Sequence, residues 1–190
     1  MKLVNFIKNN LFLQNFVASI VSYIHPFIEV NVAKYMAIKK AMYITATDQT
    51  YGSYMEFGVF TGSSFNFAMK INKQIEKYGF GKMDCEFIGF DSFKGFGSVK
   101  KEDEHPNFKF GRIFSVDEKK ILRNIEKRAK KQKFRIIKGF YNDTIENKTT
   151  KDLKIDKARV VMIDCDLKES TRLALEFIKP SIQEGTIILF

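Results

Sequence analysis

The stretch that decides the fold is Tyr54–Lys70, which reads YMEFGVFTGSSFNFAMK. It starts with a short apolar run that contains Glu56, and Gly58 and Gly62 follow before a helical pattern begins. The apolar positions of that pattern share one helical face: Ala68, Ile71 and Ile75. The order predicts a strand, a tight glycine turn and a helix.

The glycine turn has the composition of a ligand-binding turn. Glycine lets the backbone bend sharply and lets a ligand approach without a Cβ in the way. The start of the following helix, at Ser63, offers N–H groups and the positive end of a dipole to a polar ligand. Phe60 stands where many nucleotide-binding turns have their middle glycine. The spacing alone also fits an ordinary strand-to-helix turn, so both interpretations stay open.

Four further apolar runs follow the first one along the chain. They are Cys85–Phe90, Phe134–Lys138, Ala158–Ile163 and Gly185–Phe190. Helical patterns alternate with them, and continuous apolar strands are typical of a parallel sheet that helices cover on both faces. At 190 residues, the chain is long enough for one such α/β domain.

Acidic residues follow two of these strands. Asp91, with Ser92 beside it, ends the second strand, and Asp164 and Asp166 follow the fourth. Acids at the carboxyl ends of parallel strands face the region where such sheets bind ligands, and the acid after the second strand binds ribose hydroxyls in nucleotide-binding folds. Asp164 and Asp166 would repel each other unless a cation such as Mg²⁺ lay between them. The simpler alternative for Asp91 and Asp166 is a helix or turn cap.

Two helical patterns precede the first strand, over residues 1–26 and 27–46. We therefore predict a helical extension over 1–46, which covers the site or contacts a second subunit as a homodimer, and a cofactor-binding domain over 47–190. The second pattern predicts one buried stripe: Val30, Ala33, Ala37, Ala41 and Ile44. The longest apolar stretch, Leu11–Ile24, is too short for a transmembrane segment of about 20 residues. It leaves a weak peripheral membrane contact open.

Charge and cysteine content narrow the class of function. The net charge is +10, which suits anionic partners, but the basic helix after Ser115 has no aromatic residues between its charges. We therefore favour no nucleic-acid partner. Ser115 and Glu118 match a capping box, which predicts a helix start there. Two cysteines without metal-ligand spacing, and no signal peptide, indicate a cytoplasmic protein. His105, alone in a polar loop, is a weak catalytic candidate.

The quoted strings occur together in a known order. EFGVFTGSS, GFDSF, KGFYNDTI, VVMIDCDLKEST and EGTIILF follow one another as in the macrocin O-methyltransferase family, and the resemblance covers roughly residues 30–190. The family consists of class I methyltransferases that depend on S-adenosylmethionine and act on sugar hydroxyls of natural products and glycans. The resemblance implies their Rossmann-like fold, a parallel sheet with helices on both faces.

The resemblance also implies roles for single residues. Those for the cofactor are Glu56, Gly58 and Gly62 at the methionine end with Ser63 nearby, and Asp91 at the ribose with Ser92 beside it. Phe60, within the glycine turn, is a further cofactor-binding candidate. Asp164 would be the general base and, with Asp166, a ligand of Mg²⁺ or another divalent cation. The acceptor would be a glycan or another small molecule.

Two departures from the family pattern bear on activity. Lys168 replaces an aromatic residue, so the acceptor site would differ. The family continues after the fifth strand with two more strands and a pair of acids that complete the metal site. This chain ends at Phe190, so we expect it to lack them and to bind the cofactor, and whether it catalyses the reaction at this length stays open. The alternatives are a non-catalytic binding or scaffold protein and, less favoured, an RNA methyltransferase.

Overall fold

The computed structural model describes residues 10–80, 83–97, 99, 101–103 and 115–190. The chain divides into two compact units, Met1–Met36 and Ala37–Phe190. The division falls ten residues before the predicted boundary between 46 and 47, which itself stays a prediction. The second unit contains the sheet.

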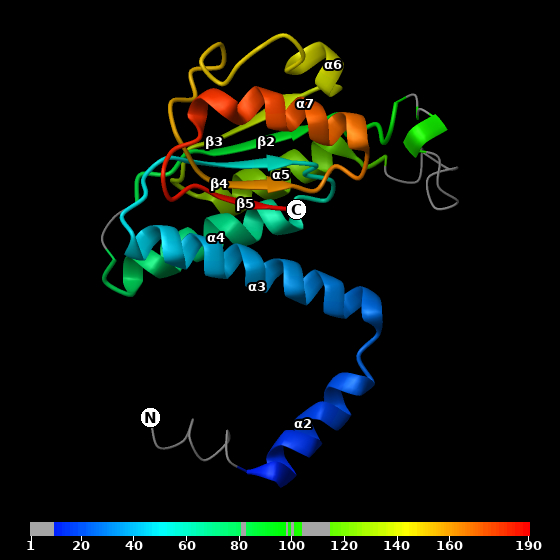
Figure 1. Cartoon of the computed structure of the whole chain (residues 1–190), viewed down its shortest axis with the longest axis vertical. Coiled ribbons are helices and arrows are strands. Elements are labelled where there is room, and N and C mark those ends of the chain that lie inside the picture. Colours follow the sequence, from blue (N-terminus) through cyan, green and yellow to red (C-terminus); the bar gives the residue numbers. More distant parts are fainter. Residues whose placement is uncertain (1–9, 81–82, 98, 100, 104–114) are drawn as a thin grey trace. The chain divides into compact units, whose positions relative to one another are not determined.

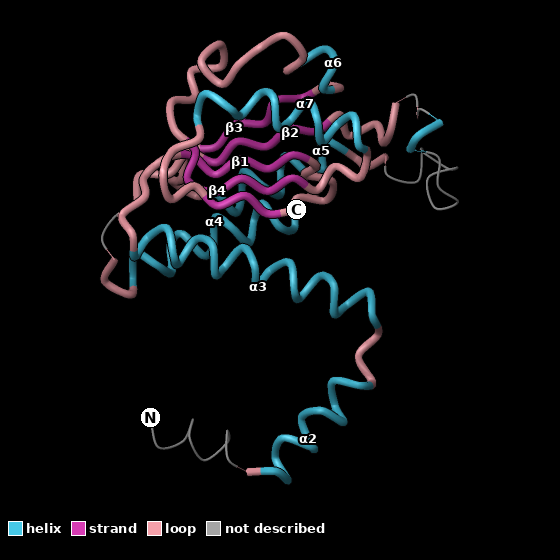
Figure 2. The backbone as a smooth tube through the Cα atoms, in the orientation of Figure 1, coloured by secondary structure: helices cyan, strands magenta, loops and turns pink. Residues whose placement is uncertain are grey.

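Five parallel strands form one sheet in the order β3-β2-β1-β4-β5 (Figures 1 and 2). Their bounds are Ser53–Phe57 for β1, Phe87–Asp91 for β2, Phe134–Lys138 for β3, Ala158–Ile163 for β4 and Ile187–Leu189 for β5. The predicted parallel α/β sheet is confirmed. The expected second and fifth strands differ most: Cys85 and Glu86 precede β2, and Gly185 and Thr186 precede β5.

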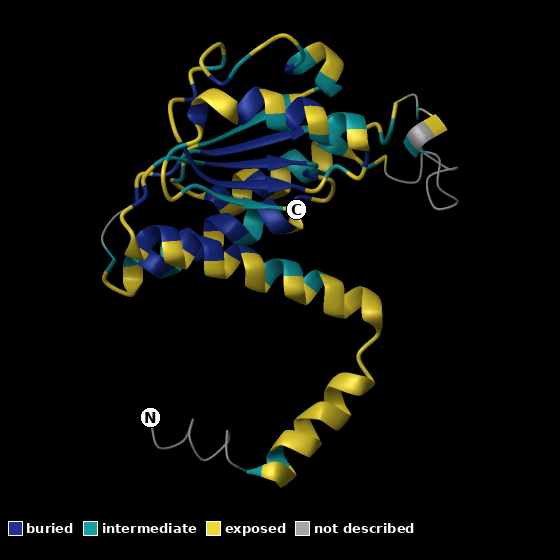
Figure 3. Ribbon diagram, in the orientation of Figure 1, coloured by how far each residue is buried: buried dark blue, intermediate teal, exposed yellow. Residues whose placement is uncertain are grey.

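Helices cover both faces of this sheet. One face packs on α4 (Ser63–Lys77), α5 (Glu118–Ala129) and the second half of α3 (Pro26–Thr47). The other packs on α6 (Tyr141–Thr144) and α7 (Lys168–Ile178), with the 3₁₀ turn η4 (Lys179–Ser181) after it. Figure 3 shows the buried strands between these two layers.

Alternation along β1 divides its side chains between the two cores. Tyr54 packs under α4, whereas Met55 and Phe57 point to the α7 side. There Phe57 stacks on Phe90 with ring centroids 4.4 Å apart, and Phe177 of α7 meets both rings edge-on. Each buried side chain of this size contributes about 1.5–3 kcal/mol, so these rings fix the register of β1 against β2.

A bulge in β4 directs the side chain of Arg159 toward the face of the sheet that packs on α4. Ser53 pairs with Ala158 and Tyr54 with Val160, so Arg159 is an extra residue between two pairs. Its guanidinium is fully buried and donates to the Thr45 hydroxyl, the Met42 carbonyl and the Asn72 amide oxygen. Bulges commonly redirect a side chain in this way. Arg159 therefore joins α3, α4 and the sheet.

The buried face of α3 differs from the predicted stripe. Of the five predicted positions only Ala41 is buried, and Val30, Ala33, Ala37 and Ile44 are exposed. The residues of α3 that face the core are those on the side of Arg159 and α4. They are Ile38, Ala41, Met42, Thr45 and Ala46. The prediction was wrong because it followed small apolar residues and ignored Thr45, whose hydroxyl receives the buried arginine.

The start of α5 also differs from the prediction. Asp117, not Ser115, is its N-cap, and the Asp117 carboxylate accepts from the Lys120 N–H at 3.1 Å. Ser115 instead pairs with Lys94 in a short antiparallel bridge. The capping-box prediction was wrong because two candidate caps lie two residues apart, and the tertiary bridge takes the first.

In the first unit, α2 (Leu11–Ser22) begins at Asn10, whose side chain accepts from the Leu13 N–H. It covers part of the helix predicted over 1–26; residues 1–9 lie outside the described residues. Within the described chain, no single helix is long and apolar enough to cross a membrane. Helices α2 and α3 reach the required length and composition only when they are taken together, and the pair is bent.

Candidate active site at the carboxyl end of the sheet

The predicted site residues gather where β1, β2 and β4 end. These strands are neighbours and parallel, so their carboxyl ends share one edge of the sheet. The Gly58 N–H donates to the Phe90 carbonyl at 3.0 Å, and the Asp164 N–H donates to the Phe57 carbonyl at 2.8 Å. The turn after β1 thus lies between the residues that end β2 and β4, as the sequence predicts.

The turn uses its glycines for backbone geometry. Gly58 and Gly62 have φ of 93° and 75°, and Phe60 between them also has a positive φ, 49°. A Cβ on Gly58 would collide with the Asp164 carbonyl, and one on Gly62 would come within 3.2 Å of Ile125. Gly58 is therefore required by the approach of β4, whether or not a ligand binds.

Helix α4 starts from this turn without a side-chain cap. Gly62 is its N-cap and makes no side-chain bond to the first turn. Such a helix start presents backbone N–H groups and a positive partial charge. Ser63, the first residue of α4, is exposed and can reach a ligand bound at the turn.

Glu56 lies under the turn, not at its surface. Its side chain is fully buried, and its two oxygens accept from the Tyr54 hydroxyl at 2.5 Å and the Ser64 hydroxyl at 2.7 Å. Burial, and then the charge of Glu56, raises the pKa of Tyr54 well above its ordinary value, so Tyr54 stays a donor. Glu56 therefore ties β1 to the first turn of α4.

Asp91 connects the end of β2 directly to the glycine turn. One carboxylate oxygen accepts from the Phe60 N–H at 2.7 Å and the other from the Phe93 N–H at 2.6 Å. Each oxygen has a second lone pair, so Asp91 retains acceptor capacity for ribose hydroxyls. The Ser92 hydroxyl belongs to the next turn, because it donates to the Gly95 carbonyl and accepts from the Lys94 N–H.

Asp164 and Asp166 are both exposed after β4, with Cys165 half-buried between them. Asp166 has a positive φ of 61°, a conformation that Asp tolerates better than most residues. Among the described residues, no group of three or more His, Cys, Asp or Glu side chains is arranged to hold a metal ion. The described acids therefore provide only part of the ligand set that Mg²⁺ requires.

Helix α7 obtains its cap from a distant loop. Asp103, in the 3₁₀ turn η1 (Lys101–Asp103), accepts from the Lys168 N–H at 3.0 Å. Leu167 is the N-cap residue, and its side chain makes no capping hydrogen bond. This bond places Asp103 at the start of α7. His105 lies outside the described residues.

Four contacts at this edge were not predicted from the sequence: those of Tyr54, Ser64, Asp103 and Tyr141. Tyr54 could have been found, because residues i and i+2 of a strand share a face. Tyr141 is oriented by a 3.3 Å hydrogen bond to the Phe90 carbonyl, and burial raises its pKa well above the ordinary value. Asp103 gave no local signal, since its partner lies 65 residues away.

The fold and this edge together define a Rossmann-like α/β protein of the class I methyltransferase type. A family model described as macrocin O-methyltransferase (TylF) matches residues 30–190, and the chain belongs to that family. The resemblance stated from the sequence is thereby confirmed.

Solved methyltransferase structures have the same fold. The calicheamicin methyltransferase CalS11 superposes with a TM-score of 0.65 at 22% identity, over 98% of this chain and 74% of that one. The O-methyltransferase NovP gives 0.64 at 22% identity, over 81% of this chain and 63% of that one. A search among curated proteins found no match. At these identities the likeness concerns the fold.

Proposed function

We propose that this protein is an S-adenosylmethionine-dependent O-methyltransferase whose acceptor is a sugar hydroxyl of a glycan or natural product. The observation that carries the proposal is the link between Asp91 and the glycine turn. The 2.7 Å bond from the Phe60 N–H to Asp91 brings the residue expected at the ribose beside the turn expected at the methionine. Family membership supports the reaction class. The similar apo structure of CalS11, a TDP-rhamnose 3'-O-methyltransferase, supports the acceptor class.

The residues present fit a nucleoside with an amino-acid tail. Gly58, Gly62 and Ser63 would hold the methionine end at the uncapped start of α4, while Phe60 and the remaining acceptor capacity of Asp91 and Ser92 would face the nucleoside. When bound, the cofactor supplies a methyl group already activated on a sulfonium. Glu56 supports this turn through Ser64, so we assign its cofactor role to positioning.

We assign to Asp164 the role of the general base that removes the proton of the acceptor hydroxyl. Its carboxylate is exposed at the end of the central strand β4, and its backbone lies against Gly58. Asp164 would take the proton of the acceptor hydroxyl as the hydroxyl oxygen bonds to the methyl carbon, while the methyl–sulfur bond breaks and S-adenosylhomocysteine leaves. The chain's remaining task is to align the hydroxyl, and a correct alignment supplies much of the rate.

Divalent-cation assistance stays a prediction. Asp164 and Asp166 would be the ligands, but the described residues do not complete a site, so no step of the mechanism depends on a metal. Activity measured with and without EDTA, then with Mg²⁺ restored, tests it. Loss and recovery of turnover would support a metal role, and unchanged turnover would contradict it.

Turnover of the Asp164→Asn variant tests the catalytic assignment. We expect kcat for methyl transfer to a nucleotide sugar to fall by about 10²–10⁴-fold, because the general base is lost. Asp156→Asn is the matched control and should keep the wild-type kcat, because Asp156 is an exposed acid just before β4, at the opposite end of that strand from Asp164. Equal rates for Asp164→Asn and the wild type would contradict the role of Asp164.

A non-catalytic binding or scaffold protein is the second candidate. It is favoured by the burial of Glu56, whose oxygens are engaged by hydroxyls of this chain. A wild type that binds S-adenosylhomocysteine but transfers no methyl group to any sugar acceptor would favour it. We propose the cytoplasm as the location, since both cysteines are free thiols, which suits a reducing compartment.

A further inference from the structure

The first unit exposes an apolar helix. No residue of α2 is buried, and its large side chains are among the most exposed apolar groups of the described chain. They are Leu11, Phe12, Phe16, Val17, Ile20 and Val21. The exposure continues past the helix, with Tyr23 at 87% and Phe27 at 73%. Contiguous apolar surface of this kind marks a site of contact with a protein or a membrane.

Apart from Leu11 and the small Ala18, the apolar side chains of α2 occupy one side of the helix. At 100° per residue, the row Phe12, Phe16 and Ile20 lies beside the row Leu13, Val17 and Val21, and the two cover about half of the circumference. The opposite side contains the small or amide residues: Gln14, Asn15, Ala18, Ser19 and Ser22. A helix with one apolar and one polar side can lie along a membrane interface, and here the basic residues stand outside α2.

The charges around α2 indicate which surface it meets. Residues 9–28 contain no Asp, Glu, Lys or Arg, so nothing charged must enter the interface with α2. The first unit, residues 1–36, contains three lysines and one acid, Glu29. Two copies of this chain would bring these lysines together, whereas anionic lipid headgroups complement them.

We propose that α2, together with Tyr23–Ile28, is a membrane-surface segment that binds anionic lipid bilayers. The helix lies in the headgroup region instead of crossing, because it has only 12 residues and no single helix of the described chain is long enough to span. Tyr23 and Phe27 suit the same depth, since aromatic side chains favour the boundary between headgroups and acyl chains. This inference does not depend on the proposed methyl transfer.

Vesicle flotation of the full chain tests the proposal. The wild type should float with phosphatidylcholine vesicles that contain phosphatidylglycerol. The floating fraction should be at least about tenfold lower with phosphatidylcholine alone, or at high salt, because the contribution of the lysines is electrostatic. Wild type that stays unbound to the anionic vesicles, or binds both vesicle types equally, would overturn it.

Matched triple variants locate the contact on one side of α2. Phe12→Ser with Phe16→Ser and Ile20→Ser should lower flotation at least about tenfold, because burial of apolar side chains provides the binding. Asn15→Ser with Ser19→Asn and Ser22→Asn should bind as the wild type does. Near-ultraviolet circular dichroism checks that the sheet unit is unchanged. If the variant with Phe12, Phe16 and Ile20 replaced by serine still floats as the wild type does, the partner of α2 is not lipid. If that variant is a monomer where the wild type is a dimer, and flotation is unchanged, the partner is a second copy of the chain.

Discussion

Gly58 and Gly79 have almost the same backbone angle in different surroundings. Their φ values are 93° and 90°. A Cβ at Gly58 would meet the Asp164 carbonyl, whereas a Cβ at Gly79 meets no described atom within 4 Å. The pair therefore separates the cost of a left-handed conformation from the cost of displacing β4.

Alanine at each position tests this distinction. We expect Gly79→Ala to cost about 1 kcal/mol, the conformational penalty alone, and Gly58→Ala to cost at least about 2 kcal/mol more. Urea denaturation of both variants measures the difference. Equal losses would show that the end of β4 yields easily, and that the turn is not held by the strand contact.

Cys85 is a buried thiol beside Arg159, and burial raises its pKa from 9.0 to about 11. Because the pKa is higher in the folded chain than in the unfolded one, the protonated thiol stabilises the fold below about pH 9. That contribution is lost as the pH rises toward 11.

We therefore expect the free energy of unfolding to fall between pH 9 and 11, by about 2–3 kcal/mol from this thiol. Denaturation at several pH values, on the wild type and on Cys85→Ala, measures it. The difference between the two isolates Cys85, since Cys165 and the tyrosines titrate in both. Parallel pH profiles would refute the assignment.

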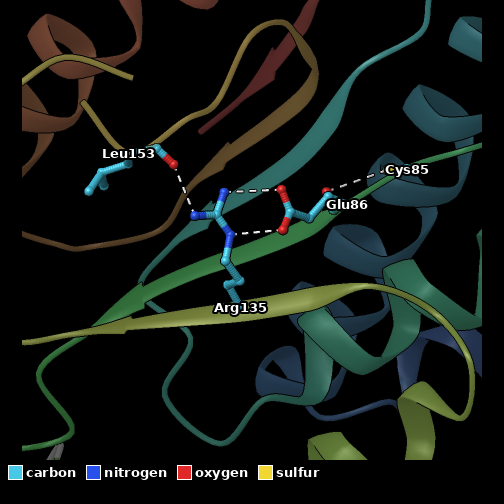
Figure 4. Close-up of polar contacts among 4 residues, drawn as sticks. All are labelled: Cys85, Glu86, Arg135 and Leu153. Atoms are coloured by element: carbon cyan, nitrogen blue, oxygen red, sulfur yellow. Dashed lines mark hydrogen bonds and ion pairs between the residues drawn. The ribbon is translucent and has the colours of Figure 1, made fainter. Parts of the chain in front are cut away.

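At the scale of elements, two arginines on strands have different tasks. Arg135 of β3 forms a two-pronged ion pair with Glu86 at 2.8 and 3.0 Å and donates to the Leu153 carbonyl, in a half-buried position (Figure 4). Arg159 of β4 is fully buried and donates to three neutral acceptors on α3 and α4. Loss of the Arg159 guanidinium leaves its buried partners without a donor, and this lowers the free energy of unfolding more than the loss of Arg135 does.

Lysine in each position measures this contrast. Arg159→Lys should cost about 2–4 kcal/mol, because one ammonium cannot replace three directed bonds in a dry site. Arg135→Lys should cost about 1 kcal/mol, as for a partly exposed ion pair. In hydrogen exchange, Arg159→Lys should also deprotect the amides of Met42–Ala46. Unchanged protection there would contradict the role of Arg159 in holding α3.

The elements were predictable to the extent that local pattern determined them. β3 and β4 begin and end where the apolar runs do, and α4 buries the predicted Ala68, Ile71 and Ile75. The buried side of α3 was not predictable, because it depends on Arg159, more than 100 residues later. The cap of α7 by Asp103 is hidden from the sequence for the same reason.

The site was predictable in position but not in every role. Parallel strands bring their carboxyl ends together, so Gly58, Asp91 and Asp164 could be placed at one edge from the strand pattern alone. Glu56 was expected at a ligand, and the structure buries it between two hydroxyls. The sequence could not show this, since the direction of a side chain at a strand end depends on the packing of the next helix.

At the scale of the whole molecule, the chain has two parts to which we assign separate tasks. Ala37–Phe190 forms the sheet with its candidate cofactor edge, and Met1–Met36 contains the exposed apolar helix. Binding at the first need not depend on the second. Cofactor affinity should therefore be the same with and without lipid vesicles.

The central claim is that the edge formed by the glycine turn and Asp91 binds S-adenosylmethionine, and calorimetry with its demethylated product, the thioether S-adenosylhomocysteine, tests it most directly. The wild type should bind one equivalent, Gly79→Ala should bind equally, and Asp91→Ala should bind at least about tenfold more weakly, because charged hydrogen bonds are lost. No binding by the folded wild type, or unchanged affinity in Asp91→Ala, would contradict the claim.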